Sequence, residues 1–174
     1  MSDTVTTMDA FVTMSSILTG FDGSVLAPKV DVNDLKTLYF DTANAQTDGL
    51  AADLVACVQQ AIIDQQSHDA IGNTLVGKAP WFDPSTPQAR VEEYVEIAKA
   101  ISKLWYLGTW YPYDPDQQSF VVSDVAYTTG LAWQVMQSHA MGNSTLTAEY
   151  WASTPAATLS DFTGMSTETG EDNG

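Results

Sequence analysis

The sequence predicts an all-α fold, a single domain of about five helices joined by long connectors rich in aromatic residues. Two observations lead to this prediction. Apolar residues recur at three- and four-residue spacing in several separate segments, as they do on one face of a helix. No stretch alternates strictly between apolar and polar residues over the length of a strand. We place the helical domain at 1–162 and expect an acidic, flexible tail at 163–174.

The segment 87–108 carries the clearest helix signal. Thr86 is expected to cap the first turn, and Pro87 suits the first helical position, where a missing N–H has no consequence. Gly108 is the expected stop, because glycine adopts the left-handed conformation without steric cost. The predicted core face of this helix consists of Val91, Tyr94, Ile97, Ala98, Ile101, Leu104 and Trp105.

Three further helices are predicted before this segment. Thr6 and Asp9 fit a capping box at the start of the first, which we expect to end at Gly20. Asp31 is expected to cap the second, which would end before a turn at 47–49. The third is predicted over 50–65. The apolar faces of the second and third are formed by Leu35, Leu38, Tyr39 and Thr42, and by Leu50, Leu54, Val58, Ala61 and Ile62.

The remaining segments carry weaker signals. Glycines and prolines interrupt 67–86, so we expect a short helical turn and a loop with Trp81 and Phe82. Ser123 is expected to cap one last helix that continues through Met136. Gly130 lies inside that helix and indicates the close approach of another backbone.

The composition excludes several classes of function. The chain has 22 acidic and 6 basic residues, a net charge of -16, which disfavours nucleic acid and anionic membrane surfaces as partners. The acids are spread along the chain, a pattern typical of solubility or of a salty medium. No apolar run is long enough for direct membrane insertion. A single cysteine, Cys57, excludes an internal disulfide.

Residues typical of catalysis are sparse. The sequence has no phosphate-binding loop and no dinucleotide fingerprint, and its two histidines, His68 and His139, lie in polar contexts. Cys57 shares a helical face with apolar residues, so we expect a buried and unreactive thiol. Asp114 and Asp116 form the best carboxylate pair, but their proline-bearing loop is typical of a turn. We therefore assign no catalytic, cofactor-binding or metal-binding residue.

Aromatic residues are concentrated in the second half of the chain. Any one of them on a helical stripe is expected to fill the core. Several nevertheless lie in a loop or near the C-terminus, where a small domain has difficulty burying every ring, and such residues are enriched at protein interfaces. The candidate partner interface consists of Trp105, Tyr106, Trp110, Tyr111, Tyr113, Trp133, Tyr150 and Trp151.

Three segments occur together in the order known from one protein family. They are 11–20 (FVTMSSILTG), 104–108 (LWYLG) and 150–155 (YWASTP). The chain resembles, over 8–155, the small (gamma) subunit of bacterial membrane-associated FAD-dependent sugar and polyol dehydrogenase complexes, of the sorbitol, fructose and glucose dehydrogenase type.

The resemblance implies a non-catalytic subunit without a cofactor of its own. FAD is expected in a large flavoprotein dehydrogenase subunit that oxidises the sugar and passes electrons to a cytochrome c subunit or another acceptor. The small subunit would assist folding of the large one and its twin-arginine export to the periplasm, with the signal removed from this sequence. Some members carry a cysteine shortly before the Tyr-Trp segment; 139–149 has none, so the resemblance does not extend to a covalent link.

Two other functions remain open at this stage. The chain could be a free-standing sugar-binding module whose aromatic loop stacks on sugar rings. It could also be a small hydrolase that uses Asp114 and Asp116 as its carboxylate pair.

Overall fold

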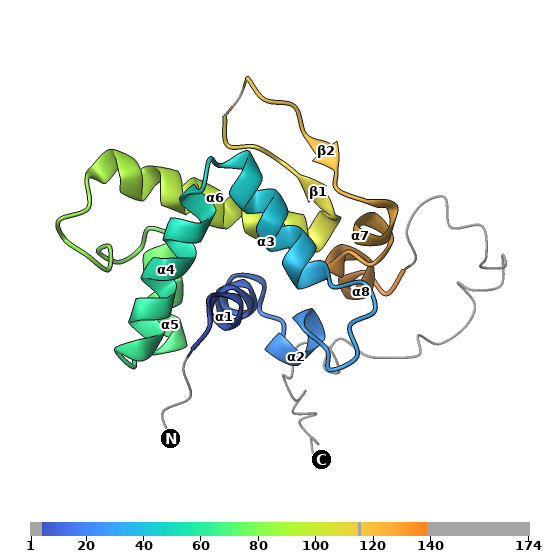
Figure 1. Ribbon diagram of the computed structural model, residues 1–174, viewed down its shortest axis with the longest axis horizontal. Coiled ribbons are helices and arrows are strands. Elements are labelled where there is room, and N and C mark those ends of the chain that lie inside the picture. The colour runs from blue at the N-terminus through green and yellow to red at the C-terminus, as the bar shows by residue number, and fades with distance from the viewer. Residues whose placement is uncertain (1–4, 115, 139–174) are drawn as a thin grey trace, which may run out of the picture.

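Helices make up most of the chain described by the computed structural model, which covers residues 5–114 and 116–138 (Figure 1). The all-α prediction is confirmed. The elements in chain order are α1 Thr7–Thr19, α2 Gly23–Leu26, α3 Leu35–Gln46, α4 Leu50–Ile63, α5 His68–Leu75, α6 Gln88–Leu107, β1 Thr109–Trp110, β2 Phe120–Val121, α7 Asp124–Thr128 and α8 Leu131–Val135.

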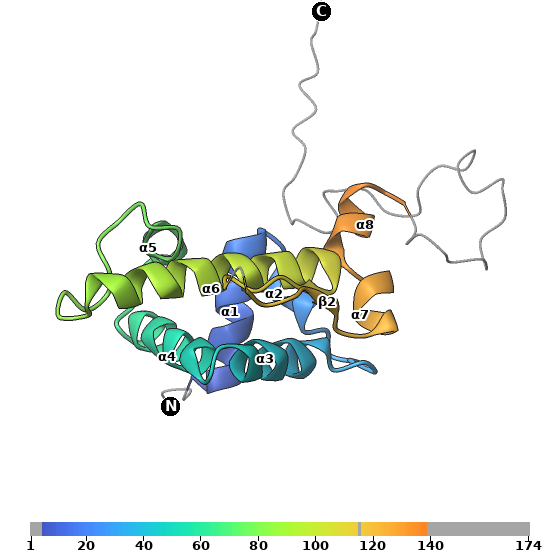
Figure 2. The same ribbon diagram turned by 90° about the horizontal axis from the view of Figure 1, so that it is seen from above.

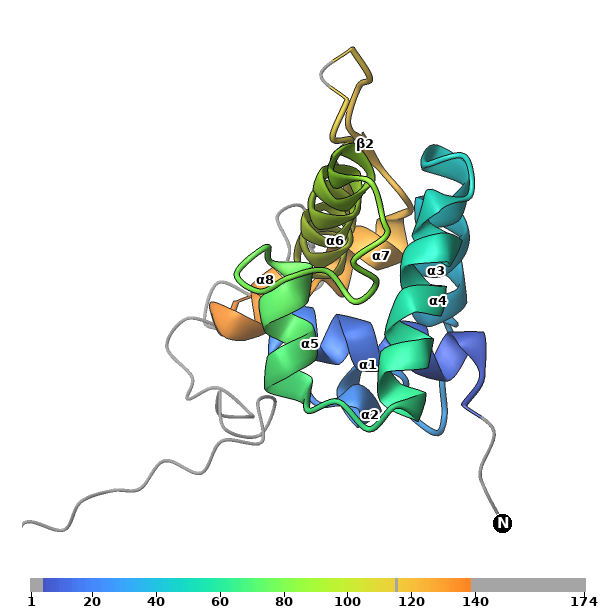
Figure 3. The same cartoon turned by 90° about the vertical axis from the view of Figure 1, so that its left-hand side faces the viewer.

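Helix α1 holds the other long helices together. It contacts α3, α4, α5 and α6. In Figure 2, α6 runs alongside the α3–α4 pair, and α1 crosses both. Figure 3, viewed from the side of α5, shows α1 running behind α5 and α4. The capping box predicted for α1 is present, because the Thr6 side chain accepts from the Asp9 N–H and Asp9 accepts from the Thr6 N–H. Gly20 ends the helix at φ 77°, as predicted.

The long helix α6 forms the predicted core face. Tyr94, Ala98, Ile101 and Trp105 are buried, together with Ile97 and Leu104, and Val91 is partly buried. Gly108 ends the helix in the left-handed conformation at φ 61°. The predicted start was wrong by one residue. Pro87 occupies the cap position itself, where its carbonyl accepts from the Arg90 and Val91 amides, and no side chain caps the helix.

The segment after Ser123 differs from the prediction of a single helix. Ser123 caps α7 by accepting from the Ala126 N–H, but α7 ends at Thr128 and α8 starts separately at Leu131. The predicted close approach at Gly130 is confirmed, because a Cβ there would lie 2.7 Å from the Tyr106 carbonyl oxygen. Gly130 leaves the helical path at this contact, with φ -52° and ψ 140°, which divides the helix in two.

A small antiparallel sheet was not predicted. Thr109 pairs with Val121 and Trp110 with Phe120, so β1 and β2 form the base of a hairpin directly after α6. Two-residue strands are too short to produce an alternating pattern in the sequence. The third predicted helix also ends earlier than expected, at Ile63 instead of Gln65, which has a positive φ of 59°.

Candidate partner-binding surface

Two of the predicted interface residues belong to the core. Trp105 is 3% exposed, its Nε1 donates to the Ser15 Oγ at 2.9 Å, and its ring meets Tyr39 edge-on at 4.7 Å. Trp110 is fully buried. The β1–β2 pairing turns the chain back after Gly108 and places Trp110 inside. Trp110 presents no surface to a partner, and Trp105 is a core residue that only lines one pocket, so the interface assignment does not fit them as exposed anchors.

Four other predicted residues are partly accessible. Tyr106 and Trp133 are half-buried, and both use their polar atoms inside the chain: the Tyr106 hydroxyl donates to the Thr19 carbonyl at 2.8 Å, and the Trp133 Nε1 donates to the Tyr127 carbonyl at 2.7 Å. Tyr111 and Tyr113, in the hairpin loop, are 38% and 36% exposed. These four retain ring surface that a partner could cover. Tyr150 and Trp151 lie outside the described residues, as does the tail at 163–174.

Sequence reasoning missed the most exposed apolar side chains of the described chain. Val30 and Val32, in the loop between α2 and α3, are 80% and 88% exposed. The sequence prediction placed a helix cap at Asp31, between the two valines, and assigned neither valine to an interface. The sequence carried no usable signal, because exposure depends on what packs against a residue and the segment forms a bent loop that no helix or strand pattern marks.

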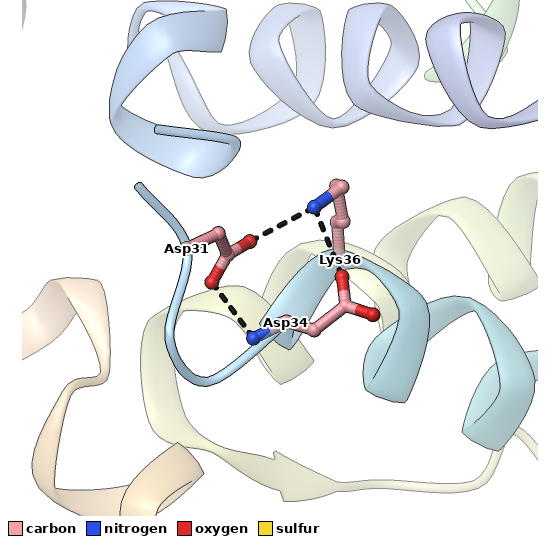
Figure 4. Close-up of polar contacts among 3 residues, drawn as sticks. All are labelled: Asp31, Asp34 and Lys36. Atoms are coloured by element: carbon pink, nitrogen blue, oxygen red, sulfur yellow. Dashed lines mark hydrogen bonds and ion pairs between the residues drawn. The ribbon is translucent and has the colours of Figure 1, made fainter. Parts of the chain in front are cut away.

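An ion-pair network fixes the loop that carries these valines (Figure 4). The Lys36 ammonium lies 3.0 Å from the Asp31 carboxylate and 2.9 Å from that of Asp34. The other Asp31 oxygen accepts from the Asp34 N–H at 2.7 Å. The hydrogen bond to Asp34, followed by that to Asp31, raises the pKa of Lys36. The loop therefore presents its valines in a defined conformation.

The role of Asp31 corrects the sequence prediction. It does not cap α3, because the helix begins at Leu35 with Asp34 in the cap position at φ 45°. The Asp31 carboxylate instead closes the preceding turn. Asp34 stands in the left-handed region, which aspartate tolerates better than most residues.

The valine loop and α8 border one pocket of about 260 Å³. Val30 and Val32 line it from the loop, Leu131 and Gln134 line it from α8, and Tyr39 and Trp105 line it from the core. The Gln134 Oε1 is buried and accepts no hydrogen bond from the described residues. We call Val30, Val32, Leu131 and Gln134 the loop–α8 surface. It combines apolar area with an unused acceptor, as a protein interface does.

The remaining candidates do not assemble into a reactive site. One Asp114 oxygen accepts from the Asp116 N–H at 3.0 Å and the other accepts from the Gln117 amide at 3.4 Å, so Asp114 shapes its own turn. Cys57 is half-buried instead of fully buried, and burial, followed by the charges of Asp53 and Asp83, raises the pKa of its thiol. A raised pKa disfavours the reactive thiolate.

His68 is the exposed first residue of α5, and His139 lies outside the described residues. Within 5–114 and 116–138, no three His, Cys, Asp or Glu side chains are grouped as a metal site. Over the same residues, no helix has both the length and the apolarity that crossing a membrane requires.

Comparison with known proteins identifies no relative: no family model, no curated protein and no solved structure matches this chain. The function is therefore inferred from the geometry of the loop–α8 surface and from the three sequence segments 11–20, 104–108 and 150–155.

Proposed function

We propose that this chain is the non-catalytic small subunit of a flavin-dependent sugar or polyol dehydrogenase complex, and that it binds the large subunit through the loop–α8 surface. The observation that carries the proposal is the exposure of Val30 and Val32 on a loop held by the Lys36 ion pairs. Exposed valines on an ordered loop beside a pocket favour a partner surface over a mobile connector. The three family-like segments suggest which partner.

In this proposal the small subunit acts by mass action. It binds the folded large subunit and not the unfolded one, which stabilises the folded form by about 2.7 kcal/mol when its concentration is a hundredfold above the dissociation constant. FAD and the oxidation of the sugar belong to the large subunit, and electrons pass to a cytochrome c subunit or another acceptor. The small chain assists folding of its partner and export to the periplasm.

Affinity purification of the full chain from its native source tests the proposal. The expected result is a yellow complex with a large second polypeptide and dye-linked sugar dehydrogenase activity. The double variant Val30→Asp/Val32→Asp should lose the partner and the colour, because two charges would be buried in the interface. The matched control, Ile63→Asp/Val76→Asp, changes two exposed apolar residues on other elements and should retain both.

A colourless single chain that binds sugar would contradict the proposal and favour the free-standing sugar-binding module. Exposed Tyr111 and Tyr113 are the residues that such a module would use for stacking. A yellow complex that survives the Val30→Asp/Val32→Asp change would retain the subunit role and place its interface elsewhere.

A further inference from the structure

A second, larger groove lies along the N-terminal half of α6, between this helix and the loop that follows α5. Its volume is about 780 Å³, within the range of ligand-binding clefts. We call it the α6 groove and define it by Trp81 and Asp83 from the loop and by Val91, Glu92, Val95 and Glu96 from the helix. The 20-residue α6 spans about 30 Å, and the loop–α8 surface lies toward its other end (Figure 2).

The loop wall of the groove is held in place by the rest of the chain. The Asn73 carbonyl accepts from the amides of Lys78 and Ala79, and the Thr74 hydroxyl donates to the Pro80 carbonyl at 3.3 Å. Trp81 stacks on Tyr94 of α6, with ring centroids 5.1 Å apart and an angle of 19° between the ring planes. The groove is therefore a preformed feature, with one wall fixed to the other by the stacked rings.

The groove combines apolar and negative surface. Val91 and Val95 are partly buried side chains on its helical wall, while Asp83, Glu92 and Glu96 are exposed carboxylates around it. Among the residues that the structure describes, no lysine or arginine lines it. Glu96 lies 2.6 Å from Lys99 outside the groove, a surface ion pair that a ligand can displace at small cost.

Trp81 adds an unused donor. The side chain is 8% exposed, and its buried Nε1 has no hydrogen-bond partner among the described residues. Trp105 and Trp133 both donate to oxygen atoms of this chain, whereas the Nε1 of the fully buried Trp110 also has no partner among the described residues; of these two unpaired indoles, Trp81 is the one that lines the groove. A buried indole N–H without an acceptor reduces the stability of an isolated domain. A small shift of the loop on ligand binding would let this N–H donate to an acceptor of the ligand.

We propose that the α6 groove binds a basic segment of another polypeptide, with an apolar side chain against Val91 and Val95 and lysine or arginine side chains facing Asp83, Glu92 and Glu96. Charge complementarity selects this occupant. A second copy of this chain carries the same net charge of -16. Residues 139–174 of the chain contain acidic residues but no lysine or arginine, so their net charge is negative, like that of the groove.

This inference does not depend on the proposed dehydrogenase complex, because it concerns a different surface and is tested on the isolated full chain. A phage-displayed library of random dodecapeptides is selected on the chain at low salt. The selected peptides should combine lysine or arginine with an apolar residue. Their affinity should fall about tenfold in Glu92→Gln/Glu96→Gln, and it should fall in about 0.5 M NaCl.

Asp41→Asn/Asp48→Asn is the matched control, since it removes two exposed carboxylates on the α3 side and leaves the groove intact. It should bind the selected peptides like the unchanged chain. In NMR spectra, peptide binding should shift the indole N–H signal of Trp81, identified with Trp81→Phe, and leave that of Trp105 in place.

Three results would overturn the inference. The selection could yield no specific peptide, or peptides without basic residues. The peptides could bind Glu92→Gln/Glu96→Gln as tightly as the unchanged chain. They could also move other indole signals and leave that of Trp81 unchanged.

Discussion

The Trp105 indole donates a hydrogen bond to the Ser15 hydroxyl across 2.9 Å, and it joins α6 to α1 through two side chains that are both buried. The tryptophan lies on the core face of α6, and the serine lies on the buried face of α1. There the serine is a polar residue within an otherwise apolar pattern. The pairing explains why a serine is tolerated there, since the indole N–H satisfies it.

The first prediction concerns this bond. Ser15→Ala leaves the Trp105 N–H buried without an acceptor, so the free energy of unfolding should fall by about 1–3 kcal/mol. Urea denaturation measures the change. Ser102→Ala on α6, where the side chain is only partly buried, is the control and should have a smaller effect. Equal losses in the two variants would show that the bond contributes nothing specific.

The second prediction concerns the end of α6. Gly108 stands at φ 61°, and a Cβ there would overlap the Ala126 carbonyl of α7. Gly108→Ala should therefore reduce the free energy of unfolding by about 2–5 kcal/mol, from the left-handed conformation and the overlap together.

Gly20→Ala separates these two effects. Gly20 is also left-handed, at φ 77°, but open space surrounds it, so this variant should lose only about 1–2 kcal/mol. The urea midpoints of the two variants are compared. Similar losses in the free energy of unfolding would contradict the close contact between α6 and α7.

The third prediction concerns the valine loop. Lys36→Gln removes both ion pairs that hold it, so amide hydrogen exchange should accelerate at Asp34, whose N–H donates to the Asp31 carboxylate. The free energy of unfolding should change by less than about 1 kcal/mol, because the lysine is partly exposed to solvent. Lys103→Gln, on exposed α6 surface, should leave the exchange of the loop unchanged. Unchanged exchange in Lys36→Gln would mean that the ion pairs do not order the loop.

The fourth prediction concerns alkaline pH. Burial raises the pKa of Tyr39, whose hydroxyl donates to the Ala126 carbonyl at 3.4 Å. The folded chain thus holds this proton more tightly than the unfolded chain, where tyrosine ionises near pH 10. The stabilisation is complete below about pH 10 and is lost progressively above it.

Urea titrations over this alkaline range measure the loss. Tyr39→Phe should make the free energy of unfolding less dependent on pH above about 10, because the variant has no proton to lose at this position. Tyr111→Phe, in the exposed hairpin loop, is the control and should keep the slope of the unchanged chain. A slope in Tyr39→Phe equal to that of the unchanged chain would contradict the buried, protonated tyrosine.

The candidate surface shows where prediction from sequence reached its limit. Trp105 was predicted both in the core face of its helix and at an interface, whereas Trp110 was placed at an interface because a small domain has difficulty burying every ring of a loop. The β1–β2 hairpin decided otherwise for Trp110, and it is held by pairing between residues that lie ten and twelve positions apart, Trp110 with Phe120 and Thr109 with Val121. Val30 and Val32 were overlooked because exposure depends on what packs against a residue, which local pattern does not reveal.

The sequence by itself determined the helical class, the core face of α6, the capping box at Thr6 and Asp9, and the glycine stops at Gly20 and Gly108. These features arise from contacts between residues within a few positions of each other, so spacing and residue type suffice. Only the tertiary structure decided the break at Gly130, the burial of Trp110 and the α6 groove. Each of these depends on atoms from separate segments meeting in space, which no local pattern specifies.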